Sequence, residues 1–229
     1  MELDAEQLRR PWWQQPSMSM LLALLISLVL YPFAEHSRAF RIAAQSMDIA
    51  AVLMVVRAVR AHAVWWRSGW VFALPLVLLQ VAVLLRSSPS SELLLLWAQV
   101  AFHGYATLVL LAYVMRDDVV TIDELFAIAS MYILVALLWA SAYALVVHAD
   151  PNAIFINSTN NLDGVVSYAD LVYFSMTTLT SVGYGEITPV SPAARALAML
   201  QQVFGILFVA IVIARMTGMY VRRGAGRGR

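Results

Sequence analysis

The sequence predicts an all-α membrane protein with six transmembrane helices and one half-length helical segment between the fifth and the sixth. Hydrophobic residues make up 62% of the chain and charged residues 13%, whereas an ordinary soluble domain has about 45–50% and about 25%. The mean hydropathy is +0.76. Six apolar runs each approach the length of about 20 residues that a helix needs to cross a bilayer. This pattern leaves little room for a soluble domain.

Missing residue types exclude several kinds of chemistry. The 229 residues include no cysteine, which excludes disulfides, thiolate catalysis and cysteine metal sites. All 15 basic residues are arginine, so a Schiff-base lysine and a P-loop lysine are excluded as well. The formal net charge of +1 gives no reason to expect nucleic acid as a partner. We expect neither an enzyme nor a protein that holds a cofactor.

Each apolar run is assigned to one spanning helix. The first, 18–34, follows Trp12 and Trp13, which suit the aromatic belt at a membrane surface. Its acidic flank lacks the basic start of a signal peptide. The second, 39–66, is the most charged because it carries Asp48 and three arginines. The remaining runs are 70–85, 93–115, 125–147 and 193–221.

The arginines divide unevenly between the two ends of these helices. If the N-terminus is cytoplasmic, 11 of the 15 arginines lie on the cytoplasmic side. The other four are Arg38, Arg41, Arg86 and Arg195. Because cytoplasmic loops carry an excess of positive charge, we expect a multi-pass protein of the cell membrane with both termini in the cytoplasm.

The half-length segment has clear signals for its start and its end. Ser167 and Asp170 have the spacing of a capping box, which begins a helix. The helix is expected to run to about Thr180, where the glycine-rich residues 182–185 end it. Non-helical backbone at membrane depth occurs only where protein or a watery cavity surrounds it, so the pattern indicates a pore loop. Pro192, after Ser191, then begins the last helix.

The segment 177–186, T-T-L-T-S-V-G-Y-G-E, resembles the selectivity-filter signature of the potassium channels, T-x-x-T-x-G-Y-G-[DE]. The resemblance implies that backbone carbonyls replace the hydration shell of K⁺. The implied K⁺-binding filter residues are Ser181, Val182, Gly183, Tyr184 and Gly185, with carbonyls from the first four and the Ser181 hydroxyl as ligands. Gly183 and Gly185 would adopt left-handed backbone, which a Cβ disfavours.

The same resemblance implies residues that support the filter and residues that form a gate. The filter-support residues are Tyr173, Phe174, Thr177, Thr178, Thr180, Glu186 and Arg195. Tyr173 and Phe174 would form an aromatic cuff with Tyr184, and Glu186 would contact both Arg195 and the Tyr173 hydroxyl. The inner-gate residues are Gly205 as a hinge and Ala210, Ala214 and Thr217 where inner helices converge. Close packing of helices is the alternative role for Gly205.

Four positions depart from the family pattern. Ser181 stands where threonine is usual and keeps only the hydroxyl. Tyr173 and Phe174 stand in place of a tryptophan pair, and Glu186 stands where aspartate is commoner. We expect potassium selectivity to survive these changes.

The resemblance covers about 122–221, and the four preceding helices match only the six-helix plan of the voltage-gated-like superfamily. We therefore divide the chain into a cytoplasmic N-terminal segment (1–17), a four-helix voltage-sensor-like domain (18–116), a pore domain (117–221) and a short basic tail (222–229). No arginine lies between Arg86 and Arg116, so we expect opening that is not steeply voltage-dependent. Arg57 and Arg60 either sense voltage or reach to the cytoplasmic surface.

These observations predict a channel that conducts K⁺ passively. One pore loop cannot surround an axis, so a homotetramer is expected, with membrane lipid and potassium ions as its other partners. A non-selective cation channel on the same scaffold is an alternative, although the intact Gly-Tyr-Gly argues against it. A secondary transporter or a non-conducting scaffold is a further alternative, but a transporter would require paired broken helices.

Overall fold

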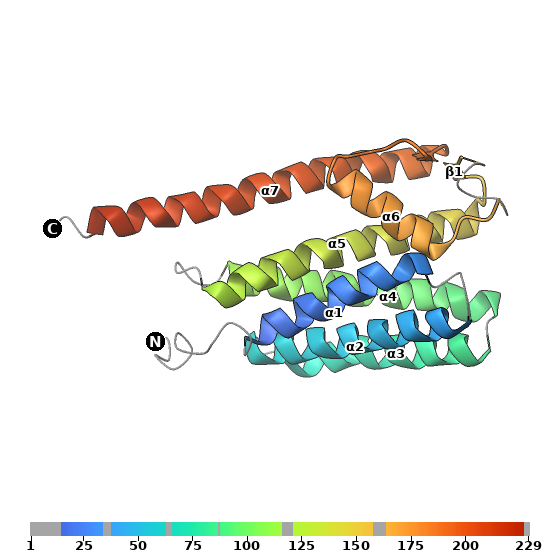
Figure 1. Cartoon of the computed structure of the whole chain (residues 1–229), viewed down its shortest axis with the longest axis horizontal. Helices are drawn as coiled ribbons and strands as arrows, with labels where there is room; N and C mark the ends of the chain where they lie inside the picture. The colour runs from blue at the N-terminus through green and yellow to red at the C-terminus, as the bar shows by residue number, and fades with distance from the viewer. Residues whose placement is uncertain are drawn as a thin grey trace. The chain divides into compact units, whose positions relative to one another are not determined.

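The computed structural model describes residues 15–33, 38–62, 66–86, 88–115, 121–157 and 164–226. Its elements in chain order are α1 (Pro16–Leu30), η3 (Tyr31–Phe33), α2 (Arg38–His62), α3 (Trp66–Leu85), α4 (Pro89–Val114), α5 (Ile122–Ala149), β1 (Ile154–Ile156), α6 (Tyr168–Leu179), β2 (Ile187–Pro189) and α7 (Pro192–Gly226). Figure 1 shows them coloured along the chain. Most of the predicted N-terminal segment and the last three residues of the basic tail lie outside the described residues.

Four helices of the described chain are long and apolar enough to cross a membrane. They are Pro16–Phe33, Pro89–Val114, Ile122–Ala149 and Pro192–Arg215. α3 contains a shorter apolar stretch, Gly69–Leu85, and α2 carries the charged residues noted above. Length and composition therefore support four of the six predicted spans, and the chain is a membrane protein.

The chain folds as two compact units. The first contains the described residues up to 138, and the second contains the described residues from 139 onward. The boundary between the units falls within α5, which is one continuous helix. Its residues up to 138 belong to the first unit, and the remainder belong to the second.

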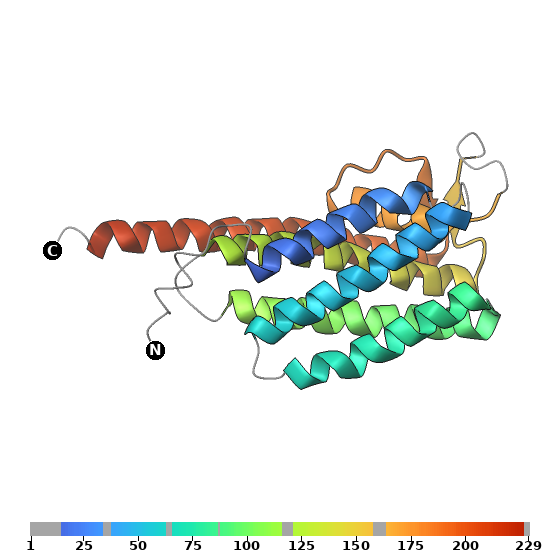
Figure 2. The ribbon, with the colours of Figure 1, turned by 60° about the horizontal axis from the view of Figure 1, so that its bottom comes forward.

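In the first unit, helices that follow one another in sequence also pack together, because the connections between them are short. α1 packs against α2, α2 against α3, and α3 against α4. Each runs opposite to the one before it (Figure 2). The largest fully buried side chains of this unit are apolar and include Met20, Leu76, Phe102 and Leu110. A continuous apolar core therefore holds these helices together.

Asp123, at the start of α5, joins three helices of the first unit. Its carboxylate accepts hydrogen bonds from the Ser17 backbone N–H at 3.0 Å and from the Ser17 hydroxyl at 2.9 Å. The Tyr113 hydroxyl of α4 donates to the same carboxylate at 3.2 Å. Asp123 thus serves as an external cap for the N-terminus of α1, where backbone N–H groups lack partners within the helix.

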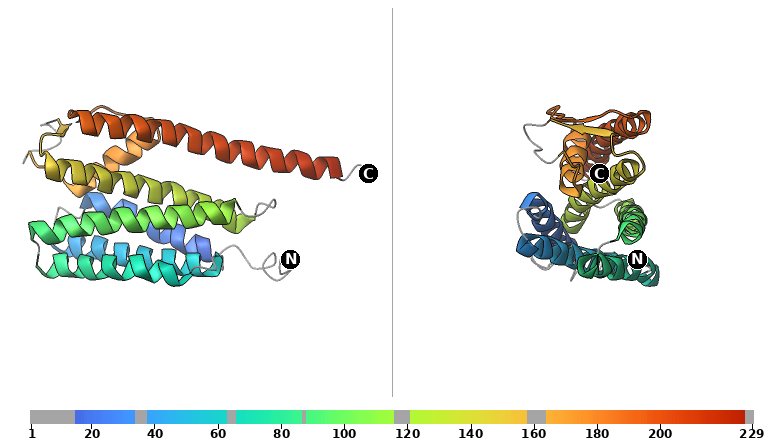
Figure 3. Two further views of the ribbon diagram at one scale, coloured as in Figure 1. Left: turned by 180° about the vertical axis from the view of Figure 1, so that it is seen from behind. Right: turned by 90° about the vertical axis from the view of Figure 1, so that its right-hand side faces the viewer.

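In the second unit, a two-stranded sheet closes the segment that holds α6. β1 pairs antiparallel with β2, with Ile154 opposite Pro189 and Ile156 opposite Ile187. The Asn157 N–H extends the pairing by donating to the Glu186 carbonyl at 2.9 Å. The short helix α6 lies beside the start of α7 (Figure 3). This strand pair was not predicted from the sequence.

The predicted helix starts in the second unit are confirmed. The Ser167 hydroxyl accepts from the Asp170 N–H at 3.1 Å, and the Asp170 carboxylate accepts from the Ser167 N–H at 3.0 Å. This is the capping box expected at the start of α6. The Ser191 hydroxyl accepts from the Ala194 N–H at 3.1 Å, and Pro192 is the first residue of α7.

Candidate functional site

The end of α6 sets the geometry of the glycine-rich segment that follows it. The Ser181 N–H donates to the Thr178 carbonyl at 3.1 Å, and the Val182 N–H donates to the Thr177 carbonyl at 2.9 Å. These two bonds form a Schellman motif, whose first residue after the cap takes a left-handed conformation and is usually glycine. Here that residue is Ser181, with a φ of 59°. The sequence analysis did not anticipate left-handed backbone at this serine.

Left-handed backbone recurs at every second residue of this segment. Gly183 has a φ of 52° and Gly185 a φ of 89°, as predicted. A Cβ added at either glycine would meet nothing within 4 Å. The requirement for glycine is therefore conformational and not a matter of space. Alternating handedness turns successive peptide N–H groups to one side, and the carbonyls consequently face the other.

The carbonyl groups of residues 181–184 are available to a ligand. All four residues are exposed in the single chain. Among the described residues, none of their carbonyls accepts a backbone hydrogen bond. They follow directly from the C-terminal end of α6, where the helix dipole contributes a partial negative charge. The arrangement therefore suits a cation, and carbonyl oxygens are hard ligands of the kind that bind weakly polarising cations.

Tyr173, Tyr184 and Glu186 form one cluster beside this segment. The Tyr173 hydroxyl donates a hydrogen bond to the Glu186 carboxylate, which confirms the predicted contact. The rings of Tyr173 and Tyr184 stack, with centroids 6.4 Å apart and an angle of 5° between their planes. The bond to Glu186 raises the pKa of the Tyr173 hydroxyl to about 12, so this hydroxyl stays protonated and remains a donor at neutral pH.

Phe174 faces a different neighbour from the predicted cuff. It is buried, and its ring packs edge-on against Tyr143 of α5, with centroids 4.9 Å apart. Successive helical residues point about 100° apart, because a helix has 3.6 residues per turn. Tyr173 and Phe174 consequently point to different sides of α6, Tyr173 toward Tyr184 and Phe174 toward Tyr143 in the core of the unit.

Arg195 has a different partner from the predicted one. Its Nε donates to the Pro189 carbonyl at 3.2 Å. The predicted pair of Glu186 and Arg195 is absent within the described part of a single chain. The reason is that Arg195 lies one turn into α7, within reach of the end of β2, while Tyr173 holds the Glu186 carboxylate.

The three threonines predicted to support the filter belong to the last turn of α6 and its cap. The Thr177 hydroxyl donates to the Phe174 carbonyl at 3.0 Å, and the Thr180 hydroxyl donates to the Met176 carbonyl at 2.8 Å. Thr178 is buried. The Thr177 and Thr180 hydroxyls thus bond to carbonyls of their own helix, as serine and threonine hydroxyls commonly do.

Gln201 is the residue that sequence reasoning missed. Its side-chain amide Nε2 donates to the Ser175 carbonyl at 2.9 Å and approaches the Ser175 hydroxyl at 2.8 Å. Its Oε1 accepts from the Tyr143 hydroxyl at 2.7 Å. All three side chains are fully buried. A single amide thus joins α5, α6 and α7, and the available signal was the pair of glutamines, Gln201 and Gln202, within a mostly apolar stretch of α7.

Gly205 permits a close approach between α7 and Leu179 at the end of α6. A Cβ added there would lie within 3.0 Å of the Leu179 carbonyl oxygen and 3.2 Å from the Leu179 side chain. α7 continues as a helix through this position. The geometry favours the packing role that the sequence left open beside the hinge. Further along α7, Ala210, Ala214 and Thr217 are exposed in the single chain.

Comparisons with known proteins show that the site lies in the part of the chain that matches a protein-family model. A family model described as "Ion channel" matches residues 131–222, which include the end of α6 and the glycine-rich segment. Protein LctB of Geobacillus stearothermophilus is 30% identical over 125 residues, covering 50% of this chain and 92% of that protein.

Two named potassium channels match over shorter stretches. Inward rectifier potassium channel Kirbac3.1 of Paramagnetospirillum magnetotacticum is 32% identical over 60 residues, which are 26% of this chain and 20% of that protein. Two pore potassium channel c of Oryza sativa subsp. japonica is 37% identical over 60 residues, which are 26% of this chain and 13% of that protein. The match thus spans a fifth or less of either channel.

Proposed function

Because the chain belongs to the ion channel family, we propose that four copies of it form a potassium-selective pore that conducts K⁺ passively across the cell membrane. One observation carries the proposal. Residues 181–184 present four carbonyl groups that accept no backbone hydrogen bond among the described residues, directly after the C-terminal end of a half-length helix. Such a row of carbonyls can replace the hydration shell of K⁺.

The number of filter segments supports an assembly of several chains, which we propose to be a tetramer. One chain supplies one such segment, and a closed ring of ligands around an axis requires several copies. The exposed apolar surface of α7 supports this view. Its exposed side chains include Val203, Phe204, Ile206, Leu207, Ile211 and Ile213. In a membrane, an apolar surface of this kind is covered by lipid or by other copies of the chain.

Both termini are proposed to lie in the cytoplasm.

Potassium selectivity is tested by the reversal potential of purified protein in a planar bilayer. With a tenfold K⁺ gradient balanced by Na⁺, a K⁺-selective pore should reverse close to the K⁺ equilibrium potential, about 59 mV from zero. A non-selective cation pore should reverse near zero under the same conditions, and that result would contradict the proposal. Gly183→Ala serves as the matched variant, because alanine is strained at a φ of 52°, and its selectivity should fall.

Opening should depend only weakly on voltage. Steep gating requires three to four charges per subunit that move through the field, each worth about 2.3 kcal/mol per 100 mV. The helix α4 contains no arginine. In α2, Arg57 is exposed, whereas the Arg60 side chain lies outside the described residues. A conductance–voltage curve from about −100 to +100 mV should be shallow, and a steep curve that Arg57→Gln flattens would overturn this expectation.

Removal of the Tyr173 hydroxyl should shorten openings without unfolding the protein. Tyr173→Phe keeps the ring stack with Tyr184 but loses the bond to Glu186. A hydrogen bond of this kind contributes about 0.5–1.5 kcal/mol, so the melting temperature should change little. Single-channel recording measures open times. Tyr168→Phe is the matched control, since Tyr168 also lies on α6 and its hydroxyl bonds to Ser141. Equal open times in both variants would contradict the role of Tyr173.

A further inference from the structure

The first unit contains a small cavity with several polar side chains in its lining. The proposed pore does not use this cavity. Five helices line it, and most of the lining is apolar. Four polar side chains also face it: Asp48 of α2, Gln80 of α3, and Gln99 and His103 of α4. The cavity volume is about 10 Å³, which matches the space that one water molecule requires. Ionisable groups inside a membrane helix bundle are costly and usually serve a function.

Asp48 is held in place by two hydroxyl groups. Ser27 of α1 donates to Oδ1 at 2.6 Å, and Tyr31 of η3 donates to Oδ2 at 2.6 Å. Among the described residues, no arginine side chain contacts this carboxylate. Arg57, the next described arginine on α2, is exposed and lies nine residues further along the helix. Among the described side chains, the carboxylate is thus oriented by neutral donors and faces the cavity.

Two further polar atoms at the cavity have no partner. Gln80 Oε1 and His103 Nδ1 are buried and make no hydrogen bond in the described structure. Gln80 is 3% exposed and His103 is 7% exposed. A buried polar atom without a partner costs about 1–3 kcal/mol. Both atoms lie on residues that line the same cavity as Asp48.

The chemistry of these groups selects the ligand. A carboxylate and an amide oxygen accept hydrogen bonds, and a neutral imidazole offers one nitrogen that accepts. All three therefore favour a species that brings positive charge or hydrogens. A cavity for a single water leaves no room for a hydrated metal ion, and an imidazole nitrogen is a poor ligand for a hard cation such as Na⁺. A proton, carried on water or on the side chains, satisfies all three groups.

We propose that this cavity is a proton-binding site, in which Asp48 and His103 share one proton that moves between them through a water hydrogen-bonded to Gln80. Binding one proton from solvent takes the pair from a net charge of −1 to 0, with the proton on the carboxyl or on the imidazole. The two groups then titrate as a coupled pair. Among the described residues, the other titratable group that faces Asp48 is Tyr31 of η3, and α5 contributes the apolar Leu134 and Leu137 to the cavity.

Infrared difference spectroscopy of the full chain in lipid, recorded between acidic and alkaline pH, tests the proposal. A protonated carboxyl group gives a C=O stretching band that an ionised one lacks. The band assigned to Asp48 should vanish in Asp48→Asn. Its midpoint should move by about one pH unit or more in His103→Gln, because the proton is shared. Tyr31→Phe and Ser27→Ala retain Asp48 and should each shift the frequency of the band, which keeps the test valid if Asp48→Asn folds poorly.

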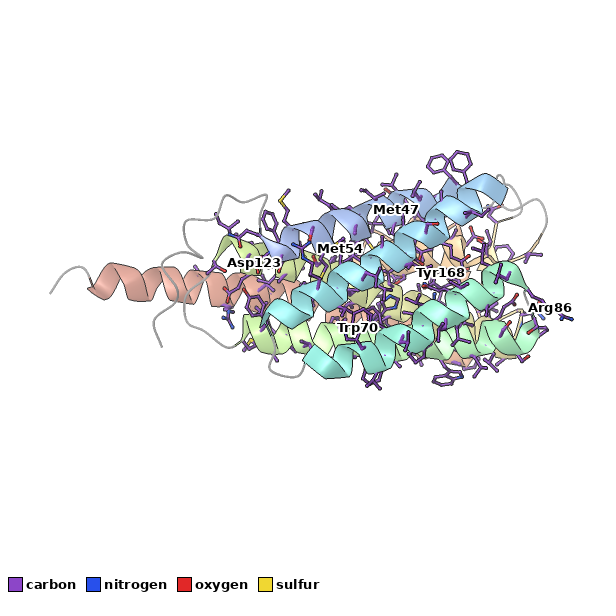
Figure 4. The ribbon with its side chains drawn as sticks, turned by 90° about the horizontal axis from the view of Figure 1, so that it is seen from below. Met47, Met54, Trp70, Arg86, Asp123 and Tyr168 are labelled. Carbon is purple, nitrogen blue, oxygen red and sulfur yellow. The ribbon has the colours of Figure 1, made fainter. Side chains whose placement is uncertain are left out.

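Asp123→Asn is the matched control, since Asp123 is a buried carboxyl of the same unit and does not line the cavity. Figure 4 labels it at one end of the helices, away from Met47, the neighbour of Asp48. This variant should leave the Asp48 band unchanged. Three results would overturn the proposal. The first is that no band depends on Asp48, and the second is that the midpoint pH of the band is the same in His103→Gln. The third is that the band is lost when NaCl replaces choline chloride at fixed pH, which would indicate a sodium site.

Discussion

Replacement of Gly205 by alanine is expected to destabilise the second unit by about 1–3 kcal/mol and to impair ion selection. The added Cβ would meet the backbone carbonyl of Leu179, which cannot move unless the end of α6 moves with it. Ser181, the first of the residues proposed to bind K⁺, lies two residues later, so a shift of Leu179 displaces these residues. Gly205→Val should be more severe because its side chain is larger.

Thermal unfolding and reversal potentials measure the two effects of Gly205→Ala. Gly104→Ala is the matched control, because a Cβ at Gly104 of α4 would meet only the Leu138 side chain at 4.0 Å. Alanine there should be neutral or stabilising by about 0.5–1 kcal/mol, as is usual inside helices. A hinge role makes a different prediction for Gly205→Ala, namely altered open probability with stability and selectivity intact. That outcome would contradict the packing role.

Replacement of Gln201 by leucine should have the second large effect. Leucine has a similar volume but removes the acceptor of the Tyr143 hydroxyl and the donor to the Ser175 carbonyl. Each buried group that loses its partner costs about 1–3 kcal/mol. We expect a lower melting temperature and briefer openings, because α6 loses its polar connection to both long helices of the unit.

Variants at neighbouring positions separate this network from general packing. Gln202→Leu is the matched control, since Gln202 is adjacent in sequence but exposed, and it should change neither quantity. Gln201→Glu retains an acceptor for Tyr143, but its carboxylate would place a buried charge against the Ser175 carbonyl oxygen, so it should destabilise the unit at least as much as Gln201→Leu. In a double-mutant cycle, Tyr143→Phe and Gln201→Leu should be clearly non-additive, because they share one hydrogen bond. Additive effects would show that the network does not act as a unit.

The local elements of the second unit were predictable because their signals lie within a few residues. The spacing of Ser167 and Asp170 specifies a capping box, and the pair Ser191 and Pro192 specifies a helix start. Both formed as expected. Gly183 and Gly185 adopt the left-handed backbone that their lack of a Cβ permits. In each case the bonding partners are near in sequence, so the residue types alone determine the conformation.

Partners that lie far apart in the sequence were not predictable in the same way. Arg195 bonds to Pro189 and not to Glu186, Phe174 packs on Tyr143 and not beside Tyr184, and Gln201 reaches Ser175 from 26 residues away. Each of these choices depends on the angle and distance at which one helix meets another. One sequence carries no local signal for those quantities, since they result from the packing of many side chains at once.

By itself, the sequence determined that this protein is a helical membrane protein with a half-length helix and a Gly-Tyr-Gly segment before its last helix. Apolar run length and short-range capping are properties of contiguous residues, which explains this success. The tertiary structure alone decided that Ser181 takes the left-handed position and that Gly205 is a contact with Leu179. It also decided that Asp48, Gln80 and His103 face one cavity, because close approach between separate helices is fixed only when the whole core packs.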